Sequence, residues 1–190
     1  MLRFILLIIL WLTVLFITII FLPILLLISI FILLFDGAPV LFQQDRIGKN
    51  NKIFKMYKFR TMVNEVGNIP KSEITNPDSF ITLSGGFLRK FSLDELPQLF
   101  NVLNGSMNLI GYRPCLSNER RVINERKKYK LETFKPGITG WAQINGRDNI
   151  SIEEKVYLDA FYFKNRSVYL DLKILAKTIL HVILKKDVSH

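Results

Sequence analysis

The hydrophobic and polar positions divide the chain into a long apolar N-terminal segment and a mixed remainder. Residues 4–35 form a run of 32 residues without a charged side chain, interrupted only by Thr13, Thr18, Pro23 and Ser29. A secretory signal carries an apolar region of about 7–15 residues and a small-residue cleavage site, and this run is longer. The pattern therefore predicts a membrane-embedded segment over residues 1–35 and a catalytic or binding domain over residues 36–190.

The length of this run and its proline leave two membrane arrangements open. A helix rises about 1.5 Å per residue, so the run would extend roughly 48 Å, whereas a hydrocarbon core is about 30 Å thick. Proline removes a helical hydrogen-bond donor and bends or breaks a helix. A re-entrant helix broken near Pro23, entering and leaving on one membrane face, fits this length. A single tilted span with a tolerated proline also fits.

The charges beside the apolar run orient the second domain. Only Arg3 precedes the run, whereas six basic residues follow it closely: Arg46, Lys49, Lys52, Lys55, Lys58 and Arg60. Because cytoplasmic flanks of membrane segments carry the excess of Lys and Arg, we expect the domain to lie on the cytoplasmic face.

The second domain is expected to be α+β and mostly helical. Residues 41–47 and 53–59 flank the turn-rich residues 48–51, which predicts a small β-hairpin. Residues 168–186 predict an amphipathic helix with one apolar face, formed by Leu170, Ile174, Leu175, Ile179, Val182 and Ile183. Such a helix would lie on an anionic membrane surface or pack on the domain. The expected architecture is a compact core surrounded by amphipathic interfacial helices.

A further short helix is predicted around residues 96–103 from its apolar spacing. Either Ser92, in a capping box with Glu95, or Asp94, with Pro97 in the first turn, would cap it. Both versions place Asp94 and Glu95 at the positive end of a helix dipole. That position would lower the pKa of Asp94 and keep it ionised, and consecutive helical side chains would point about 100° apart.

The composition narrows the chemistry that the domain can perform. The chain has 26 Lys and Arg against 16 Asp and Glu, for a net charge of +10. Its single Cys115 excludes an intrachain disulfide and a Cys-based zinc site. Its two histidines, His181 and His190, lie near the C-terminus, which argues against a His-centred triad. The basic residues are scattered, so anionic lipid explains them as well as nucleic acid does, and we expect no nucleic-acid partner.

The adjacent pair Asp94 and Glu95 is the sharpest candidate for chemistry, although an acidic residue at a helix start is commonly only a cap. Turn-associated arginines can clamp phosphate oxygens. Mg²⁺ is bound by one or two carboxylates together with substrate phosphates, and a carboxylate can also act as a covalent nucleophile. The candidate phosphate-binding residues are Arg89, Arg113 and Arg147, with Lys58 and Arg60 as further cations.

Six segments carry recognisable motifs: residues 42–48, 57–62, 87–90, 92–102, 111–114 and 135–147. Together they resemble the bacterial sugar transferase family, and more narrowly its small monotopic phosphoglycosyl transferases. The resemblance covers nearly all of the chain in the family's order, and the Asp-Glu-Leu-Pro and Pro-Gly-Ile-Thr-Gly blocks are its most specific motifs. Two positions depart from the family pattern: Leu22 stands where a serine usually precedes the membrane proline, and Tyr112 stands in the usual Gly-Pro-Arg-Pro turn.

The resemblance implies a reaction and the residues that perform it. A sugar-1-phosphate would move from a UDP-sugar to polyprenyl (undecaprenyl) phosphate at the cytoplasmic face of the bacterial inner membrane, as the first membrane step of glycoconjugate assembly. Asp94 would be the covalent nucleophile and a ligand of Mg²⁺, and Glu95 its proton-handling partner. Arg89, Arg113 and Arg147 would bind phosphate. Membrane lipids are expected partners, and the resemblance leaves room for downstream glycosyltransferases.

Two other function classes fit the same residues. A non-enzymatic, membrane-tethered basic protein would bind lipid headgroups or nucleic acid and use Asp94 and Glu95 only as caps. A Mg²⁺-dependent membrane hydrolase of diphosphates would release sugar phosphate to water without a lipid acceptor. Substitution of the acidic pair and the need for a lipid acceptor separate these classes.

Overall fold

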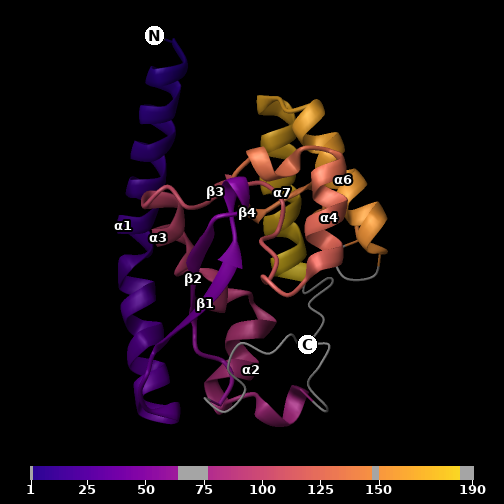
Figure 1. Cartoon of the computed structure of the whole chain (residues 1–190). Coiled ribbons are helices and arrows are strands. Elements are labelled where there is room, and N and C mark those ends of the chain that lie inside the picture. The colour runs from indigo at the N-terminus through magenta and orange to yellow at the C-terminus, as the bar shows by residue number, and fades with distance from the viewer. Residues whose placement is uncertain (1, 64–76, 147–149, 185–190) are drawn as a thin grey trace.

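The computed structural model describes residues 2–63, 77–146 and 150–184, and its mostly helical α+β architecture confirms the predicted fold class (Figure 1). The helices are α1 (Leu2–Asp36), α2 (Leu83–Lys90), α3 (Gln98–Leu103), α4 (Arg120–Lys128), α5 (Trp141–Ile144), α6 (Ile152–Lys164) and α7 (Val168–Leu184). The strands are β1 (Leu41–Ile47), β2 (Ile53–Phe59), β3 (Asn108–Ile110) and β4 (Gly137–Thr139).

Helix α1 is continuous over Leu2–Asp36, and Pro23 lies inside it. The break that we expected near Pro23 is therefore not present. A proline removes only its own backbone donor, and prolines are tolerated in apolar helices where neighbouring groups re-satisfy the backbone. Residues Trp11–Asp36 are long and apolar enough to cross a membrane by length and composition. The re-entrant topology and the membrane face of the domain stay predictions.

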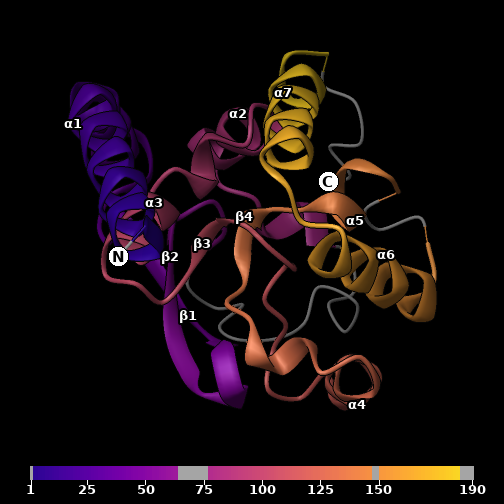
Figure 2. The ribbon, with the colours of Figure 1, turned by 90° about the horizontal axis from the view of Figure 1, so that it is seen from above.

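One side of α1 packs along the rest of the molecule, as Figures 1 and 2 show. Leu25, Ile28 and Ile32 are buried against Phe59 of β2 and Leu88 of α2. The opposite side exposes large apolar side chains, including Leu27 and Leu34, which are 67% and 76% exposed. The helix thus shares a core with the domain on one face and offers an apolar face to its surroundings on the other.

The predicted β-hairpin is confirmed. Strands β1 and β2 pair antiparallel, from Leu41 opposite Phe59 to Ile47 opposite Ile53. The connection is a 3₁₀ turn over Lys49–Asn51. Its Asn50 has a φ of 54°, a left-handed conformation that asparagine tolerates better than most residues. The hairpin lies beside α1 (Figure 1), and Phe59 at the end of β2 belongs to the core that α1 shares with the domain.

The predicted caps of the helix around residues 96–103 are wrong. Helix α3 begins only at Gln98 and has Pro97 at its N-cap, without a side-chain capping bond. A separate 3₁₀ turn, Leu93–Glu95, precedes it, and Ser92 before that turn is left-handed with no side-chain cap. Pro97 has no N–H and is best accommodated at the start of a helix, and α3 begins directly after it. Asp94 and Glu95 consequently lie in this 3₁₀ turn and not in the first turn of an α-helix.

Strands β3 and β4 bring two sequence motifs together. They pair in parallel, with Asn108 opposite Gly137 and Ile110 opposite Thr139. A Cβ on Gly137 would lie 2.1 Å from the backbone N of Gly111, so only glycine permits this approach. The contact fixes the start of the segment 111–115 that follows β3.

Helix α7 differs from its predicted pattern. Leu170 and Ile174 are buried in a core that also contains Ile110, Ile144 and Tyr162. Ile179 and Ile183, which were expected on the same face, are 61% and 66% exposed. The apolar residues of α7 therefore occupy a core-facing side and an exposed side, and an interfacial location of this helix stays a prediction.

Candidate active site

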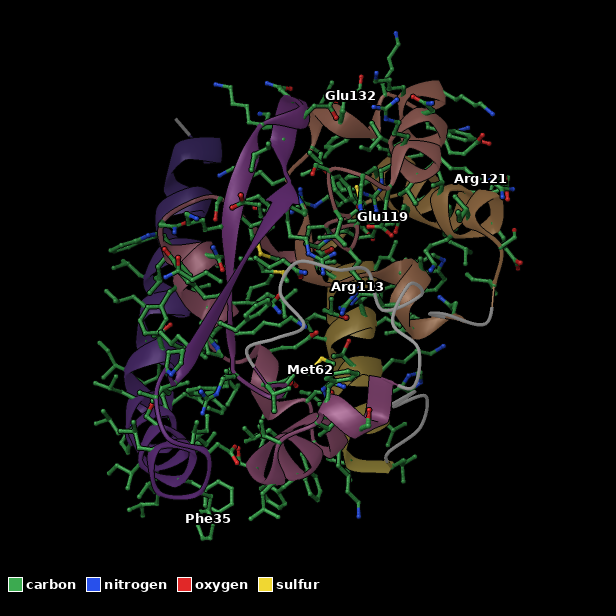
Figure 3. The ribbon with its side chains drawn as sticks, turned by 60° about the horizontal axis from the view of Figure 1, so that its bottom comes forward. Phe35, Met62, Arg113, Glu119, Arg121 and Glu132 are labelled. Atoms are coloured by element: carbon green, nitrogen blue, oxygen red, sulfur yellow. The ribbon has the colours of Figure 1, made fainter. Side chains whose placement is uncertain are left out.

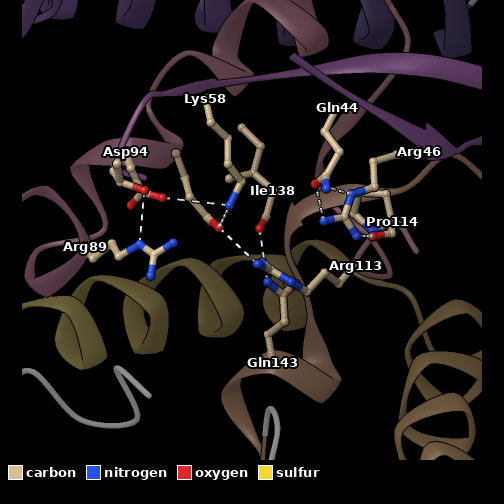
Figure 4. A network of polar contacts seen from close by, with 11 residues as sticks. Gln44, Arg46, Lys58, Arg89, Asp94, Arg113, Pro114, Ile138 and Gln143 are labelled. Atoms are coloured by element: carbon tan, nitrogen blue, oxygen red, sulfur yellow. Dashed lines mark hydrogen bonds and ion pairs between the residues drawn. The ribbon is translucent and has the colours of Figure 1, made fainter. Parts of the chain in front are cut away.

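The two predicted acidic residues converge on one lysine. Asp94 and Glu95 lie in the 3₁₀ turn between α2 and α3, and Asp94 is 8% exposed. The Nζ atom of Lys58, on β2, is 2.8 Å from Glu95 Oε1 and 3.8 Å from Asp94 Oδ2 (Figure 4). We expected the side chains of Asp94 and Glu95 to point about 100° apart, yet both carboxylates reach the same lysine. Their carboxylates can act on one bound group.

Two arginines add positive charge to this pair. The Nη2 atom of Arg113, in the segment after β3, is 3.1 Å from Glu95 Oε1. Arg89, at the end of α2, donates from Nε to Thr61 Oγ1 at 3.0 Å and lies close enough to Asp94 to influence its ionisation. Lys58, Arg89 and Arg113 outnumber the two carboxylates. A cluster with this excess of positive charge is suited to an anionic substrate such as a diphosphate.

The surroundings shift the two carboxylates in opposite directions. Burial raises the pKa of Asp94 above its usual value, more than Lys58 lowers it, and the charge of Glu95 raises it further. Burial also opposes ionisation of Glu95, but Lys58 and Arg113 outweigh it and hold the pKa of Glu95 well below its usual range. Our prediction of a lowered Asp94 pKa is therefore wrong, because burial of the carboxyl group outweighs the cations around it. Opposite shifts in a neighbouring pair are typical of groups with different roles.

One predicted phosphate-binding residue, Arg60, does not join this cluster, and another, Arg147, lies outside the described residues. Arg60 is buried and donates to the carbonyl oxygens of Asp36, Gly37 and Ala38, at 2.6–2.7 Å, where α1 ends. Its guanidinium thus caps the C-terminus of α1 and neutralises the negative end of that helix. The phosphate-binding role of Arg147 stays a prediction.

Arg46 is an additional residue beside the cluster. Its guanidinium contacts Gln44 Oε1 and donates from Nη1 to the carbonyl oxygen of Pro114 at 3.1 Å (Figure 4). Burial and the nearby charge of Arg113 lower the pKa of Arg46 to about 10. Our sequence analysis used Arg46 only as a flanking charge, although its place in the motif 42–48 was a signal for a closer role.

The cluster has the donor atoms of a magnesium site but lacks a complete ligand set of its own. Within residues 2–63, 77–146 and 150–184, no group of three or more His, Cys, Asp or Glu side chains could hold a metal ion. Asp94 and Glu95 supply carboxylate oxygens, which Mg²⁺ prefers, and it commonly keeps waters and binds substrate phosphates as well. The residues therefore fit a divalent cation that arrives with a phosphate-bearing substrate.

Comparisons with known proteins agree with this chemistry. The model of the family described as bacterial sugar transferase matches residues 3–185. An uncharacterized sugar transferase of Bacillus subtilis is 46% identical over 156 residues, which cover 80% of this chain and 74% of that protein. An undecaprenyl-phosphate galactose phosphotransferase of Salmonella typhimurium is 40% identical, over 80% of this chain and 35% of that protein. An undecaprenyl-phosphate glucose phosphotransferase of Komagataeibacter xylinus is 38% identical, over 85% and 32%.

The region that matches this chain covers most of the length of the Bacillus subtilis relative. It covers about a third of the length of the other two relatives. The described part of this chain contains the whole cluster of Lys58, Arg89, Asp94, Glu95 and Arg113. The matched region therefore includes all the groups that the geometry brings together.

Proposed function

The chain belongs to the bacterial sugar transferase family as a phosphoglycosyl transferase, and we propose that it transfers a sugar-1-phosphate from a UDP-sugar to polyprenyl (undecaprenyl) phosphate. One observation carries the proposal. The buried Asp94 and the partly buried Glu95 are bridged by Lys58 and flanked by arginines, on a chain whose relatives include undecaprenyl-phosphate sugar phosphotransferases.

We propose Asp94 as the nucleophile. Its carboxylate oxygen attacks the sugar-bearing phosphorus of the donor, and the bond from this phosphorus to the UMP oxygen breaks, which releases UMP. A phosphate oxygen of the polyprenyl acceptor then attacks the same phosphorus and breaks its bond to Asp94. The product is a polyprenyl diphosphate sugar, and Asp94 is regenerated. A covalent step divides a transfer between a soluble and a lipid substrate into two displacements.

The cations of the cluster bind and orient the diphosphate. Lys58 and Arg113 hold Glu95 in the free enzyme, and donor phosphates compete for the same N–H groups. As these cations turn toward phosphate, the pKa of Glu95 rises, so that Glu95 becomes able to accept a proton. Arg89, close to Asp94, is placed to contact the phosphoryl group under attack. Bound Mg²⁺, held by Asp94, would neutralise charge on the diphosphate.

The apolar helix supports a location of this chemistry at a membrane. Helix α1 shares a core with β2, the strand that carries Lys58. Its exposed apolar face suits contact with lipid, and the lipid acceptor would reach the cluster from the same membrane. We propose the cytoplasmic face of the bacterial inner membrane, where UDP-sugars are available. Nucleic acid has no part in this function, and downstream glycosyltransferases would use the product.

The test is a panel of UDP-sugars with the purified full chain, Mg²⁺ and undecaprenyl phosphate, assayed for UMP release and for lipid-linked sugar. We expect at least one donor to give UMP and lipid product in equal amounts. Sugar phosphate released to water without acceptor would instead support a hydrolase. A complete lack of UMP release across a broad panel would contradict the proposal.

A further inference from the structure

The segment 111–115 is held at consecutive carbonyl oxygens by groups from distant parts of the chain. The carbonyl of Arg113 accepts a hydrogen bond of 2.6 Å from Nη2 of Arg126, which lies on α4. The carbonyl of Pro114 accepts one of 3.1 Å from Nη1 of Arg46, on β1. The carbonyl of Cys115 accepts one of 2.9 Å from the backbone N of Ile47. This segment is therefore fixed between β1 and α4.

Each of the two guanidinium groups is itself held in place. Arg126 is buried, lies 4.2 Å above the ring of Tyr112, and has Asp159 Oδ2 at 3.9 Å. Its Nε and Nη1 atoms are buried without a hydrogen-bond partner. Burying a guanidinium costs folding free energy that such a loose ion pair offsets only in part. The close polar contact of the buried Arg126 guanidinium is its hydrogen bond to the carbonyl oxygen of Arg113.

Arg46 is oriented from the other side. Both its Nε and its Nη2 atoms donate to Oε1 of Gln44, on the same strand, which leaves Nη1 directed at Pro114. The planar guanidinium makes these contacts in a fixed fork geometry, which lysine cannot reproduce. Two rigid groups from separate elements thus determine where the backbone of Arg113 lies, and its side chain extends from there to Glu95.

We propose that Arg46 and Arg126 are positioning residues that act through Arg113. They fix the backbone of this arginine so that its guanidinium reaches Glu95 in the free enzyme and a donor phosphate during transfer. The inference rests on the proposed function for its kinetic consequence, since Arg113 is proposed to bind phosphate. A displacement of about 1 Å in a group that positions substrate can cost roughly a hundredfold in rate.

The kinetic test is a double-mutant cycle in the full chain. Arg126→Lys and Arg46→Lys are each made alone and together with Arg113→Gln, and kcat and KM are measured with a UDP-sugar. We expect each lysine variant to lower kcat/KM about tenfold in the parent chain and less than about twofold in the Arg113→Gln background, because residues that act as one unit are not additive. Equal fold losses in both backgrounds, or no loss in either, would overturn the proposal.

A matched control and a second readout separate this inference from the proposed function. Arg121→Gln removes an exposed arginine of α4 whose partner is Glu153, at the edge of the molecule in Figure 3, and should leave kcat/KM unchanged. Arginine side-chain ¹⁵N NMR of Arg113, assigned by its loss in Arg113→Gln, needs no turnover. We expect the lysine variants to shift and broaden this signal. An unchanged signal in both variants would overturn the positioning role even if the parent chain transferred no sugar.

Discussion

The contact between α1 and the domain differs in kind from the polar cluster on the far side of β2. The first is a stripe of buried apolar residues on one regular helix, Leu25, Ile28 and Ile32 among them, against Phe59 and Leu88. The second draws single charged residues from β2, α2, a 3₁₀ turn and the segment after β3. Apolar contacts are non-directional and depend on buried area, whereas the cluster depends on the orientation of individual groups. The two regions should therefore fail in different ways.

The largest effect is expected from Asp94→Asn, which removes the proposed nucleophile. It should lower the turnover rate more than about a thousandfold. Its effect on folding should be small. The pKa of Asp94 is raised on folding, so above the pKa that it has in the unfolded chain its ionisation lowers the stability of the fold. Asparagine carries no charge and avoids this cost. Thermal unfolding in detergent and UMP release measure the two effects.

The control for this substitution is Asp45→Asn, because Asp45 is exposed and pairs with Lys55 at 3.6 Å. It should keep full activity. An Asp94→Asn chain that retains more than a few per cent of activity would show that the cluster does not depend on this carboxylate.

Ile32→Ala should do the opposite of Asp94→Asn: it should lower stability and leave activity unchanged. Ile32 is fully buried between α1 and the domain, so the substitution should lower the free energy of unfolding by about 2–5 kcal/mol. Activity per folded molecule should remain near that of the parent, because the side chain is not part of the cluster. Denaturant unfolding in detergent gives the stability, and initial rates at low temperature give the activity.

Ile30→Ala is the matched control on the same helix, since Ile30 is 53% exposed. We expect its effect on the free energy of unfolding to stay within about 0.5 kcal/mol. Equal losses for Ile30→Ala and Ile32→Ala would contradict a one-sided packing of α1.

A smaller effect is expected from Arg60→Gln. This substitution tests whether Arg60 stabilises the end of α1 or binds substrate phosphate with the cluster. Loss of its hydrogen bonds to the carbonyls at the end of α1 should cost about 1.5–3 kcal/mol of stability. The KM for the donor should not change. A KM that rises severalfold with unchanged stability would restore the phosphate-binding role that the sequence suggested.

The smallest effect is expected from Trp11→Phe. Trp11 Nε1 donates to the carbonyl oxygen of Leu103, at the end of α3, over 3.1 Å. Phenylalanine keeps an apolar ring but cannot donate, so the free energy of unfolding should fall by about 0.5–1.5 kcal/mol. Hydrogen–deuterium exchange of α3 should rise with it. Unchanged exchange in α3 would mean that this contact does not connect the two helices.

The same contrast explains how far the sequence could predict this molecule. The long apolar helix and the hairpin follow local patterns, and both are confirmed. The acidic pair, Lys58 and Arg113 were named from sequence motifs, and the structure brings them together, while their roles stay predictions. The 3₁₀ turn at Leu93–Glu95 was missed because one proline overrode two plausible capping patterns.

The misassigned residues were those whose role depends on distant partners. Arg60 caps a helix that ended more than twenty residues earlier in the chain, and nothing in its neighbourhood in the sequence indicates this. Arg126, which the sequence analysis did not single out, lies on the highly charged helix α4 and is buried with its guanidinium over the ring of Tyr112. A local pattern cannot distinguish a buried guanidinium from an exposed one when its partners are a backbone carbonyl and an acid on another helix.

Intact-protein mass spectrometry with a UDP-sugar and Mg²⁺, but without lipid acceptor, tests the central claim most directly. The proposed function predicts a mass increase equal to one sugar phosphate, located on Asp94 by peptide mapping, absent from Asp94→Asn, and removed when undecaprenyl phosphate is added. An adduct on Glu95, or full turnover with the lipid acceptor and no adduct on any residue, would contradict Asp94 as the covalent nucleophile.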